Sequence, residues 1–249
     1  MSTKLSDSKP GERSPAIRPL YAQVRDILIE RIGSGEWQPG ALIPNEFAIA
    51  RELGVSQGTI RKALDALAAE HLLVRRQGRG TYVAAHTPAE MLFRFFNFFD
   101  ETGERIVPDT HDFKLTEGLA SRQERERLSL ADGERVFRIR RIRTRQGAPF
   151  ILETISLPAR LFPRLGDEAA LPNTLYDHFQ KAYGVTVAGG RERLTAVIAG
   201  EEEAKALGAT PGCALLKLDR VMLGLQGRPL EWRVSLCLMD GASYVVEFR

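Results

Sequence analysis

Apolar positions in the first third of the chain recur at helical spacing. Residues 20–32 place apolar side chains three or four positions apart, with most charges on the opposite side. Two shorter stretches over 45–53 and 56–70 show the same spacing, and Asn45 and Ser56 are suitable N-caps for them. The pattern predicts three helices, of which the second and third are joined by a tight glycine-containing turn, as in a helix-turn-helix.

Strand-like residues follow the third predicted helix. Residues 72–76 and 81–84 are rich in apolar and β-branched side chains, and they flank a run from Gln77 to Gly80. This arrangement predicts a β-hairpin with a basic, glycine-rich tip. Three helices and a hairpin in this order make a winged helix-turn-helix over residues 19–84. The preceding residues 1–18 are polar, and we expect them to form a disordered tail.

The pattern changes beyond a predicted linker at residues 85–92. Residues 93–249 contain long strand-like stretches with a few helical ones between them. The predicted strands are Val136–Thr144, Phe150–Leu157, Glu192–Ile198, Ala214–Leu223, Pro229–Leu238 and Tyr244–Phe248, and the predicted helices are Leu119–Leu128, Leu175–Tyr183 and Glu202–Leu207. Hairpin-like strands with interspersed helices indicate an α+β domain built on an antiparallel sheet.

The composition is that of a folded protein. Of 249 residues, 43% are hydrophobic, which is enough to form a core and excludes a fully disordered chain. The apolar runs are far shorter than the roughly 20 residues of a membrane-spanning helix, and the polar N-terminus lacks the apolar segment of a signal peptide. Only two cysteines occur, so no disulfide framework is indicated. We expect a cytoplasmic protein.

The charge is distributed unevenly between the two predicted domains. Residues 1–86 hold 12 Lys and Arg against 9 Asp and Glu, whereas residues 87–249 hold 23 of each. The whole excess of three positive charges therefore lies in the N-terminal third. This asymmetry is typical of a small nucleic-acid-binding module joined to a neutral domain.

The predicted third helix and the hairpin tip carry groups suited to DNA. Hydroxyls and helix N-terminal amides bind phosphate oxygens, while Gln57 can pair with an adenine edge and Arg61 with phosphate or guanine. The candidate DNA-binding residues are Ser56, Gln57, Gly58, Thr59, Arg61, Arg75, Arg76, Arg79 and Gly80. For each residue alone, a solvated charged surface is the alternative. The set, however, lies on the two elements that a winged helix presents to DNA.

The first predicted strand of the second domain has an unusual face. Alternate residues of a strand share a face, so Phe137 and Ile139 are followed on the same side by Arg141 and Arg143. Two arginines placed in this way can hold a phosphate or carboxylate with forked, charge-assisted hydrogen bonds. Alternatively they pair with Glu153 or other acids in a structural network, because buried arginine needs a partner.

The motifs of the first domain match a known pattern. The matching segments are Pro19–Tyr21, Gly40–Glu46, Leu53–Ser56, Thr59–Leu64 and Arg75–Thr81. In these segments the chain resembles the GntR family of bacterial transcription regulators, and the resemblance implies binding to double-stranded DNA. Two positions depart from the family pattern, since members commonly carry arginine where this chain has Phe47 and Gln57. The departures are compatible with a shifted operator preference.

The second domain carries a second set of motifs. They are Ile139–Arg143, Gly147–Pro149, Glu153, Leu171–Tyr176, Tyr183–Val185 and Gly227–Trp232. Here the chain is similar to the effector-binding domain of HutC-type regulators, the UTRA domain, whose fold is like that of chorismate lyase. The resemblance implies an effector pocket lined by Asn97, Phe98, Arg141, Arg143, Glu153, Thr174 and Tyr176, with Glu231 as a further candidate.

These observations together predict a ligand-responsive, DNA-binding transcriptional regulator. We expect a repressor that binds an inverted-repeat operator as a homodimer and is released by a small anionic metabolite held by Arg141 and Arg143. One enzymatic alternative is a lyase-like activity of the second domain, in which Glu153 beside two arginines supplies an acid or base. An aminotransferase-like domain is excluded mainly by size, because only 163 residues follow residue 86.

No cofactor or metal is expected from the sequence. His111 and His178 are single residues with no second ligand at metal-binding spacing. Glycine-rich phosphate loops and nucleophile motifs are also missing from the sequence. A purely architectural DNA protein would leave the large neutral second domain unexplained.

Overall fold

The computed structural model describes residues 18–70, 72–84 and 96–246. The predicted linker at 85–92 and all but the last residue of the predicted tail at 1–18 lie outside the described residues.

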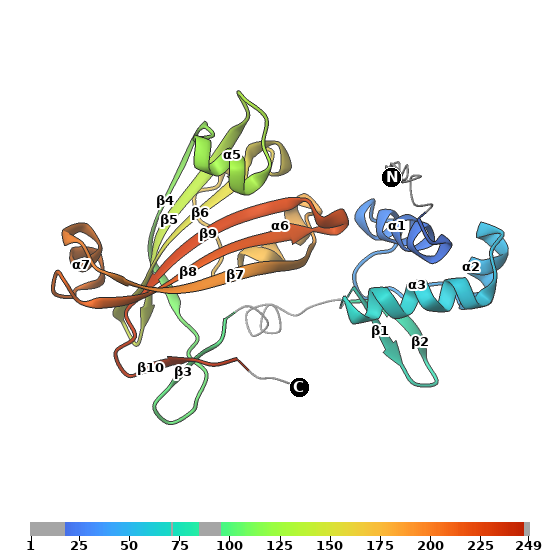
Figure 1. The fold of residues 1–249 in the computed structure, drawn as a ribbon, viewed down its shortest axis with the longest axis horizontal. Coiled ribbons are helices and arrows are strands. Elements are labelled where there is room, and N and C mark those ends of the chain that lie inside the picture. The colour runs from blue at the N-terminus through green and yellow to red at the C-terminus, as the bar shows by residue number, and fades with distance from the viewer. Residues whose placement is uncertain (1–17, 71, 85–95, 247–249) are drawn as a thin grey trace, which may run out of the picture.

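The first domain contains the predicted helices and hairpin. Its elements are α1 (Leu20–Gly33), α2 (Glu46–Leu53), α3 (Gln57–Ala69), β1 (Leu73–Arg76) and β2 (Gly80–Val83) (Figure 1). The two predicted caps are confirmed: the Asn45 side chain accepts a hydrogen bond from the backbone of Ala48, and the Ser56 side chain accepts one from the backbone of Thr59. Because a cap begins each helix, the turn between α2 and α3 is short.

Burial of one face of α3 fixes which side of that helix meets solvent. Its predicted apolar stripe is fully buried in the core of the domain, where it packs with residues of α1; the stripe consists of Ile60, Ala63, Leu64 and Leu67. The opposite side, with Gln57 and Arg61, is exposed. The apolar pattern thus orients the polar side chains of α3 outward.

The second domain is built on a six-stranded antiparallel sheet with the order β4-β5-β6-β9-β8-β7. Its strands are β4 (Asp109–Leu119), β5 (Arg135–Arg145), β6 (Ala148–Pro158), β7 (Val187–Ile198), β8 (Ala214–Gly224) and β9 (Pro229–Cys237). A separate antiparallel pair joins β3 (Phe98–Asp100) to β10 (Ala242–Tyr244). The helices are α5 (Arg122–Leu128), α6 (Leu175–Tyr183) and α7 (Glu201–Leu207), with short 3-10 turns η1 (Ala159–Leu161), η2 (Leu165–Asp167) and η3 (Leu225–Gly227).

The sequence prediction missed β3 and β4, began β7 at Glu192 although the strand starts at Val187, and misplaced two further boundaries. Strand β4 lies at the edge of the sheet and alternates only between half-buried and exposed residues, so it lacks the apolar alternation that reveals a strand. The helix predicted over 119–128 begins at Arg122, because Leu119 ends β4 and Ser121 forms a capping box with Glu124. The last strand was predicted over 244–248, but β10 ends at Tyr244.

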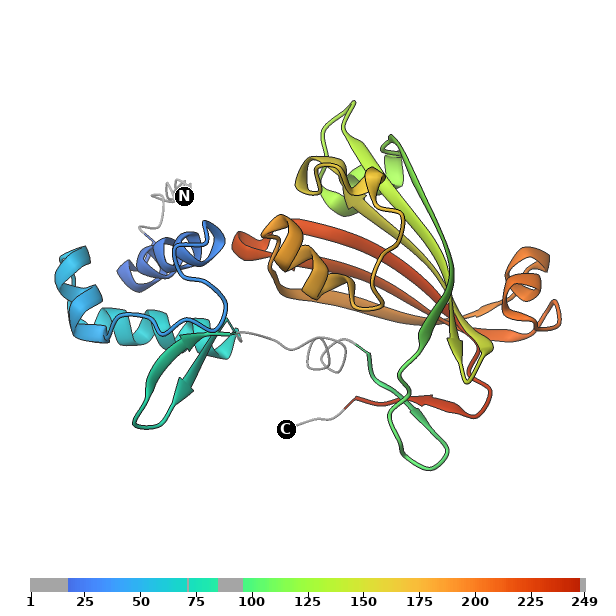
Figure 2. The same cartoon turned by 180° about the vertical axis from the view of Figure 1, so that it is seen from behind.

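Two apolar clusters cover different parts of one sheet face, which we call the inner face. Helix α6 and the turns η1 and η2 form the first cluster with β5 and β6, and β3 and β10 take part in the second. Helices α5 and α7 pack in separate clusters with other residues of the sheet. Figure 2 shows α6 lying along one end of the sheet, and the β3–β10 pair lies near the other end of the sheet. The middle of the inner face is the place where polar residues collect.

The two domains meet at the end of the β8–β9 hairpin. The end of this hairpin lies beside α1 (Figures 1 and 2), where the turn η3 contacts the helix. Leu225 of this turn packs against the core of the first domain. In the part of the chain that the structure describes, no helix has the length and apolar character needed to cross a membrane.

Candidate functional site

The exposed end of α3 gathers three polar side chains around one carboxylate. Arg61 Nη2 lies 2.9 Å from Glu46 Oε2, and the Gln57 amide donates to the same oxygen at 3.4 Å. Arg75 of β1 reaches Glu46 Oε1 at 3.7 Å. The helix and the hairpin predicted to bind DNA therefore meet at Glu46, the first residue of α2.

Glu46 was not predicted as a site residue and appeared only within a family motif. The hydrogen bond from Arg61 lowers the pKa of Glu46 below its usual range, so the carboxylate is charged at neutral pH. It holds the side chains of Gln57 and Arg61 toward the same side of the domain. Phosphate or a base edge would compete with Glu46 for these donors.

The hairpin, or wing, presents its arginines on an exposed surface. Arg75 Nη2 lies 2.7 Å from Asp65, while the Arg76 guanidinium lies 4.7 Å from the centre of the Tyr82 ring. At the tip, Gly80 has a φ of +106°, and a Cβ on it would lie 2.7 Å from Leu42 Cδ1. The wing therefore needs glycine at this position for both conformation and space.

The described structure leaves the predicted DNA-binding residues accessible. Ser56, Gln57, Gly58, Arg61, Arg75, Arg76, Arg79 and Gly80 are exposed, and Thr59 is half-buried. The Thr59 hydroxyl lies 2.8 Å from the Ser56 hydroxyl. Phe47, at a position where related regulators commonly carry arginine, has 67% of its surface exposed. The domain thus presents an apolar ring beside Glu46 in place of a cation.

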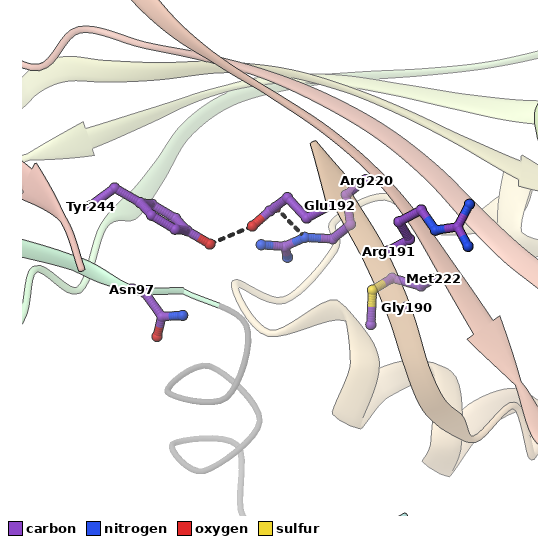
Figure 3. A pocket seen from close by; sticks show the side chains of 7 residues that line it. All are labelled: Asn97, Gly190, Arg191, Glu192, Arg220, Met222 and Tyr244. Carbon is purple, nitrogen blue, oxygen red and sulfur yellow. Dashed lines mark hydrogen bonds and ion pairs between the residues drawn. The ribbon is translucent and has the colours of Figure 1, made fainter. Parts of the chain in front are cut away.

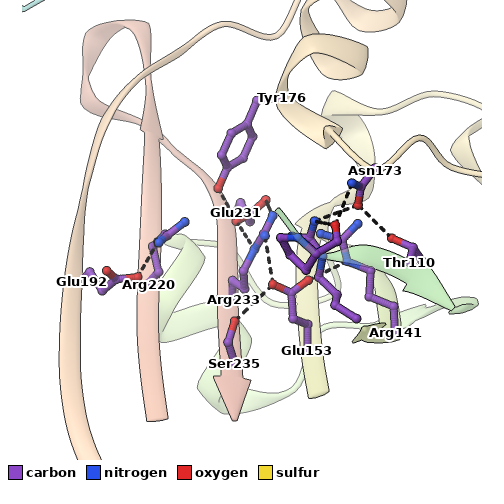
Figure 4. A network of polar contacts seen from close by, with 12 residues as sticks. Thr110, Arg141, Glu153, Asn173, Tyr176, Glu192, Arg220, Glu231, Arg233 and Ser235 are labelled. Carbon is purple, nitrogen blue, oxygen red and sulfur yellow. Dashed lines mark hydrogen bonds and ion pairs between the residues drawn. The ribbon is translucent and has the colours of Figure 1, made fainter. Parts of the chain in front are cut away.

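A buried network of charged residues crosses the inner face of the second domain (Figure 4). Arg141 of β5 lies opposite Glu153 of β6, and the Nε–Oε2 distance is 2.6 Å. Arg233 of β9 contacts Glu153 at 3.3 Å and Glu231 at 2.9 Å. The Tyr176 hydroxyl of α6 donates to Glu231 at 2.8 Å. The register of three strands therefore determines which charges meet.

The network continues to the far strands of the sheet. Arg220 of β8 lies opposite Glu192 of β7 and contacts it at 2.6 Å, and the Tyr244 hydroxyl donates to the same carboxylate. A cavity of about 120 Å³ opens here between the sheet and the β3–β10 pair (Figure 3). It is lined by Asn97, Gly190, Arg191, Glu192, Arg220, Met222 and Tyr244.

Arg143 differs from the other buried arginines. Its side chain is 2% exposed, and its Nη2 donates to the carbonyl oxygen of Pro108 at 3.0 Å and to Asn173 Oδ1 at 2.7 Å. Its Nε has no hydrogen-bond partner, and no carboxylate of a described residue lies within ion-pair distance. Burial lowers the pKa of Arg143 to about 9. Arg143 is thus a buried cation whose charge is incompletely compensated.

The charges on the inner face do not balance. The cations are Arg141, Arg143, Arg220 and Arg233, and the anions are Glu153, Glu192 and Glu231. Although burial alone would raise the pKa of Glu153, the charges of Arg141 and Arg233 hold it well below its usual range. Each of the three acids accepts a hydrogen bond from an arginine, and four arginines face these three acids. One positive charge is therefore left over among these seven side chains.

The structure brings most of the predicted effector residues together. Arg141, Glu153, Tyr176 and Glu231 lie in one network, and Asn97 lines the cavity beside it. Phe98 is buried and packs edge-on against Phe150 and Tyr244. Thr174 precedes α6 without a side-chain capping bond, and its neighbour Asn173 contacts Arg143 instead.

Five residues of this region escaped the sequence prediction: Asn173, Glu192, Arg220, Arg233 and Tyr244. The alternation of Glu231, Arg233 and Ser235 along β9 repeats the polar pattern of β5, and it was the available signal. Among the described residues, no group of His, Cys, Asp and Glu could hold a metal ion. His178 contacts Glu168 at 2.9 Å, and His111 is exposed on β4.

Comparisons with known families agree with this geometry. Residues 20–83 match the gntR family of bacterial regulatory proteins, and residues 104–242 match the UTRA domain. The fold and the two sites define a DNA-binding regulator with a second, pocket-bearing domain. The chain belongs to the GntR family, in the group whose second domain is a UTRA domain.

Individual relatives cover most of the chain. It is 32% identical to the histidine utilization repressor of Pseudomonas putida, over 81% of this chain and 77% of that protein. It is 29% identical to MngR, the mannosyl-D-glycerate transport/metabolism system repressor of Escherichia coli K12, over 86% and 90%. Among solved structures, the ligand-binding domain of a GntR-family regulator from Bordetella bronchiseptica covers 63% of this chain and 98% of its own, with a TM-score of 0.57 and 27% identity. PhnF from Mycobacterium smegmatis shares the fold over 90% of this chain and 98% of its own, with a TM-score of 0.53 and 22% identity.

The exposed surface of α3 and the wing gives a first testable prediction. Replacing Arg61 with Ala, or Arg75 and Arg79 together, should weaken operator binding and flatten its dependence on salt. Each lost phosphate contact reduces the slope of log affinity against log salt by about 0.9, because fewer counterions are released. Phe47→Arg should steepen the slope by about the same amount. The measurement is fluorescence anisotropy on a DNA selected from a random library by the wild-type protein.

Arg164→Ala is a matched control, since it removes an exposed arginine from the second domain. A slope unchanged in Arg61→Ala and in the wing variant would show that these arginines do not contact phosphates.

The unequal environments of two arginines give a second prediction. Arg143→Met should raise the free energy of unfolding by about 1–4 kcal/mol, since it removes a buried charge that lacks a carboxylate. Pro108 and Asn173 keep other donors, the Asn173 amide at 2.8 Å and the Thr110 hydroxyl at 3.2 Å. Arg141→Met should lower the free energy of unfolding by about 3–5 kcal/mol, because the buried Glu153 carboxylate loses its main ion-pair partner. Urea denaturation measures both.

The effect of Arg143→Met should depend on pH. The pKa of Arg143 is lower in the folded than in the unfolded chain, so above pH 9 the folded wild type sheds this charge and its relative stability rises. The difference between variant and wild type should therefore shrink as the pH rises past about 9. Equal destabilisation by both substitutions at neutral pH would contradict the distinction between the two arginines.

Proposed function

We propose that this protein is a transcriptional repressor that binds its operator as a homodimer and is released from it by a small anionic metabolite. The incompletely compensated charge of Arg143 carries the ligand part of the proposal. Several relatives support the repressor part, since they are repressors of histidine utilization and of mannosyl-D-glycerate transport and metabolism.

DNA binding in this proposal uses the exposed end of α3 and the wing. The first turn of α3 enters the major groove, where Gln57 and Arg61 exchange Glu46 for base edges or phosphates. Arg75, Arg76 and Arg79 lie along the backbone. Glu46 already holds the side chains of Gln57 and Arg61 in place. Binding to DNA therefore costs little further side-chain entropy at these two residues.

The effector in this proposal is a phosphorylated or carboxylated metabolite. Its anionic group takes the free donor of Arg143, while Arg141 stays with Glu153 and shapes the pocket wall. The carboxylates of Glu192 and Glu231 are acceptors for hydroxyl or amino groups on the rest of the ligand. An anion at Arg143 would balance the excess positive charge of the inner face, which supports an anion over a neutral ligand.

The operator in this proposal is an inverted repeat. One winged helix buries too little surface for high specificity, and two-fold symmetry is the commonest assembly of identical chains. We expect a dimer held by the second domain, whose charge is neutral overall. Analytical ultracentrifugation of the protein with a full repeat and with a half-site tests this. Equal affinity of a monomer for both DNAs would contradict the dimer.

The ligand part is tested by a thermal-shift screen of phosphorylated and carboxylated metabolites against the full chain. A bound effector should raise the apparent melting temperature by mass action. Arg143→Ala should abolish both this shift and the ligand response of operator binding, while binding to DNA without ligand stays within about twofold. Arg140→Ala, an exposed arginine on the same strand, is the matched control. A normal ligand response in Arg143→Ala would show that Arg143 is structural.

The enzymatic alternative makes a different prediction for the same compounds. A lyase would convert a bound compound, and Glu153→Gln would remove that turnover. A repressor returns its effector unchanged. Incubation of each hit with the protein, followed by mass spectrometry of the compound, separates the two functions.

A further inference from the structure

The end of the β8–β9 hairpin, which belongs to the second domain, packs against the apolar core of the first domain. Leu225 in its turn packs against the apolar core formed by α1, α2 and α3, and Ala188 of the adjacent β7 packs there as well. Figures 1 and 2 show this end of the hairpin beside α1. An apolar side chain of the effector domain is therefore buried in part by the DNA-binding domain.

The contact is close because α1 ends in a residue without a side chain. A Cβ added at Gly33 would lie 3.3 Å from Leu225 Cδ1, tighter than an ordinary van der Waals contact. Gly33 is not among the glycines with positive φ, so its backbone conformation does not require glycine. The missing side chain makes room for Leu225.

The same hairpin supplies three of the seven charged residues on the inner face, Arg220, Glu231 and Arg233. Arg220 of β8 lies opposite Arg233 of β9, and Glu231 lies opposite Met222. Leu225 follows Arg220 by five residues, which is about 16 Å along an extended strand. The hairpin therefore connects the candidate effector pocket directly to α1.

The end of the hairpin is packed tightly enough to move as one piece. The Gly224 amide donates to the carbonyl oxygen of Arg228 at 2.8 Å and closes the turn. A Cβ at Gly224 would lie 2.9 Å from Leu230, which is buried with Met222 and Tyr176 in one cluster. A shift at the pocket would thus reach Leu225 without being absorbed in a loose loop.

On the other side of the contact, α1 determines the position of α3. Leu28 and Ile32 of α1 are buried in the same cluster as Ile60 and Leu64 of α3. A displacement of α1 relative to the second domain therefore also moves α3, the recognition helix that is proposed to enter the major groove.

We propose that the β8–β9 hairpin transmits occupancy of the effector pocket to the DNA-binding domain through the seating of Leu225 against α1 at Gly33. This inference rests on the proposed function, since an effector shifts only those arrangements for which its affinity differs. With Leu225 seated, the recognition helix has a fixed place relative to the second domain. In a dimer this fixes the spacing of the two recognition helices, on which binding to an inverted repeat depends.

A reversible crosslink tests the proposal without knowledge of the effector. The full-length protein would carry Gly33→Cys and Leu225→Cys together with Cys213→Ser, and buried Cys237 would stay in place. Oxidation joins position 225 to position 33 at the end of α1 through a disulfide, and dithiothreitol breaks this bond. Affinity for a DNA selected by the wild type should differ by about fivefold or more between the two states. The same protein with only Leu225→Cys is the control and should show no difference.

A second variant tests transmission with inorganic phosphate as the probe. Leu225→Ser removes the apolar contact, and Arg228→Ser, at an exposed position directly after the turn, is its matched control. Phosphate should change the operator affinity of the wild type and of Arg228→Ser. In Leu225→Ser the change should fall below about twofold, while phosphate still raises the melting temperature.

The outcomes separate this inference from the proposed function. Equal operator affinity of the oxidised and reduced double-cysteine protein, with the disulfide verified by mass spectrometry, would overturn the role of the hairpin. An undiminished phosphate response in Leu225→Ser would overturn it as well. If phosphate leaves the wild type unaffected, the anion proposal loses support, and the crosslinked protein alone decides whether the hairpin controls DNA binding.

Discussion

Strand register places opposite charges face to face at two points inside the antiparallel sheet of the second domain. In this protein the pairing of β5 with β6 puts Arg141 against Glu153, and the pairing of β8 with β7 puts Arg220 against Glu192. A shift of one strand by one residue would move its charged side chains to the opposite face of the sheet. The residues opposite them would then lose their ion-pair partners. The ion pairs therefore specify the register of the second domain as much as the apolar clusters beside them.

The same constraint explains why the inner face can serve as a binding site. Two apolar clusters close its ends, and the polar row between them is sheltered from solvent by α6 and by β3 with β10. Charges in such a place interact more strongly than charges at a surface. The first domain uses a different arrangement. Glu46 is half-buried and its partners Gln57, Arg61 and Arg75 are exposed, so water and salt weaken each contact.

Local patterns predicted most of the fold, because α2 and α3 each begin at a capping side chain and each helix of the first domain buries apolar residues at helical spacing. Strand β4 escaped prediction because an edge strand needs no apolar face. The arginine pair of β5 was visible in the sequence, yet its two members have different roles, which depend on residues far along the chain. Arg141 meets an acid twelve positions away, whereas Arg143 meets Asn173 and the backbone of Pro108. Spacing within one strand cannot reveal which of two like residues receives the partner.

The surplus charge at Arg143 also bears on the lifetime of the protein in a cell. A domain that keeps an uncompensated cation in its interior opens more often than one whose charges balance, and proteases cleave opened chains. A ligand that compensates the charge would lower the population of opened molecules. The concentration of a metabolite would then set how many copies of the regulator survive, in addition to how tightly each copy holds DNA. The charge of one buried guanidinium, that of Arg143, would then affect both the degradation of the protein and its release from DNA.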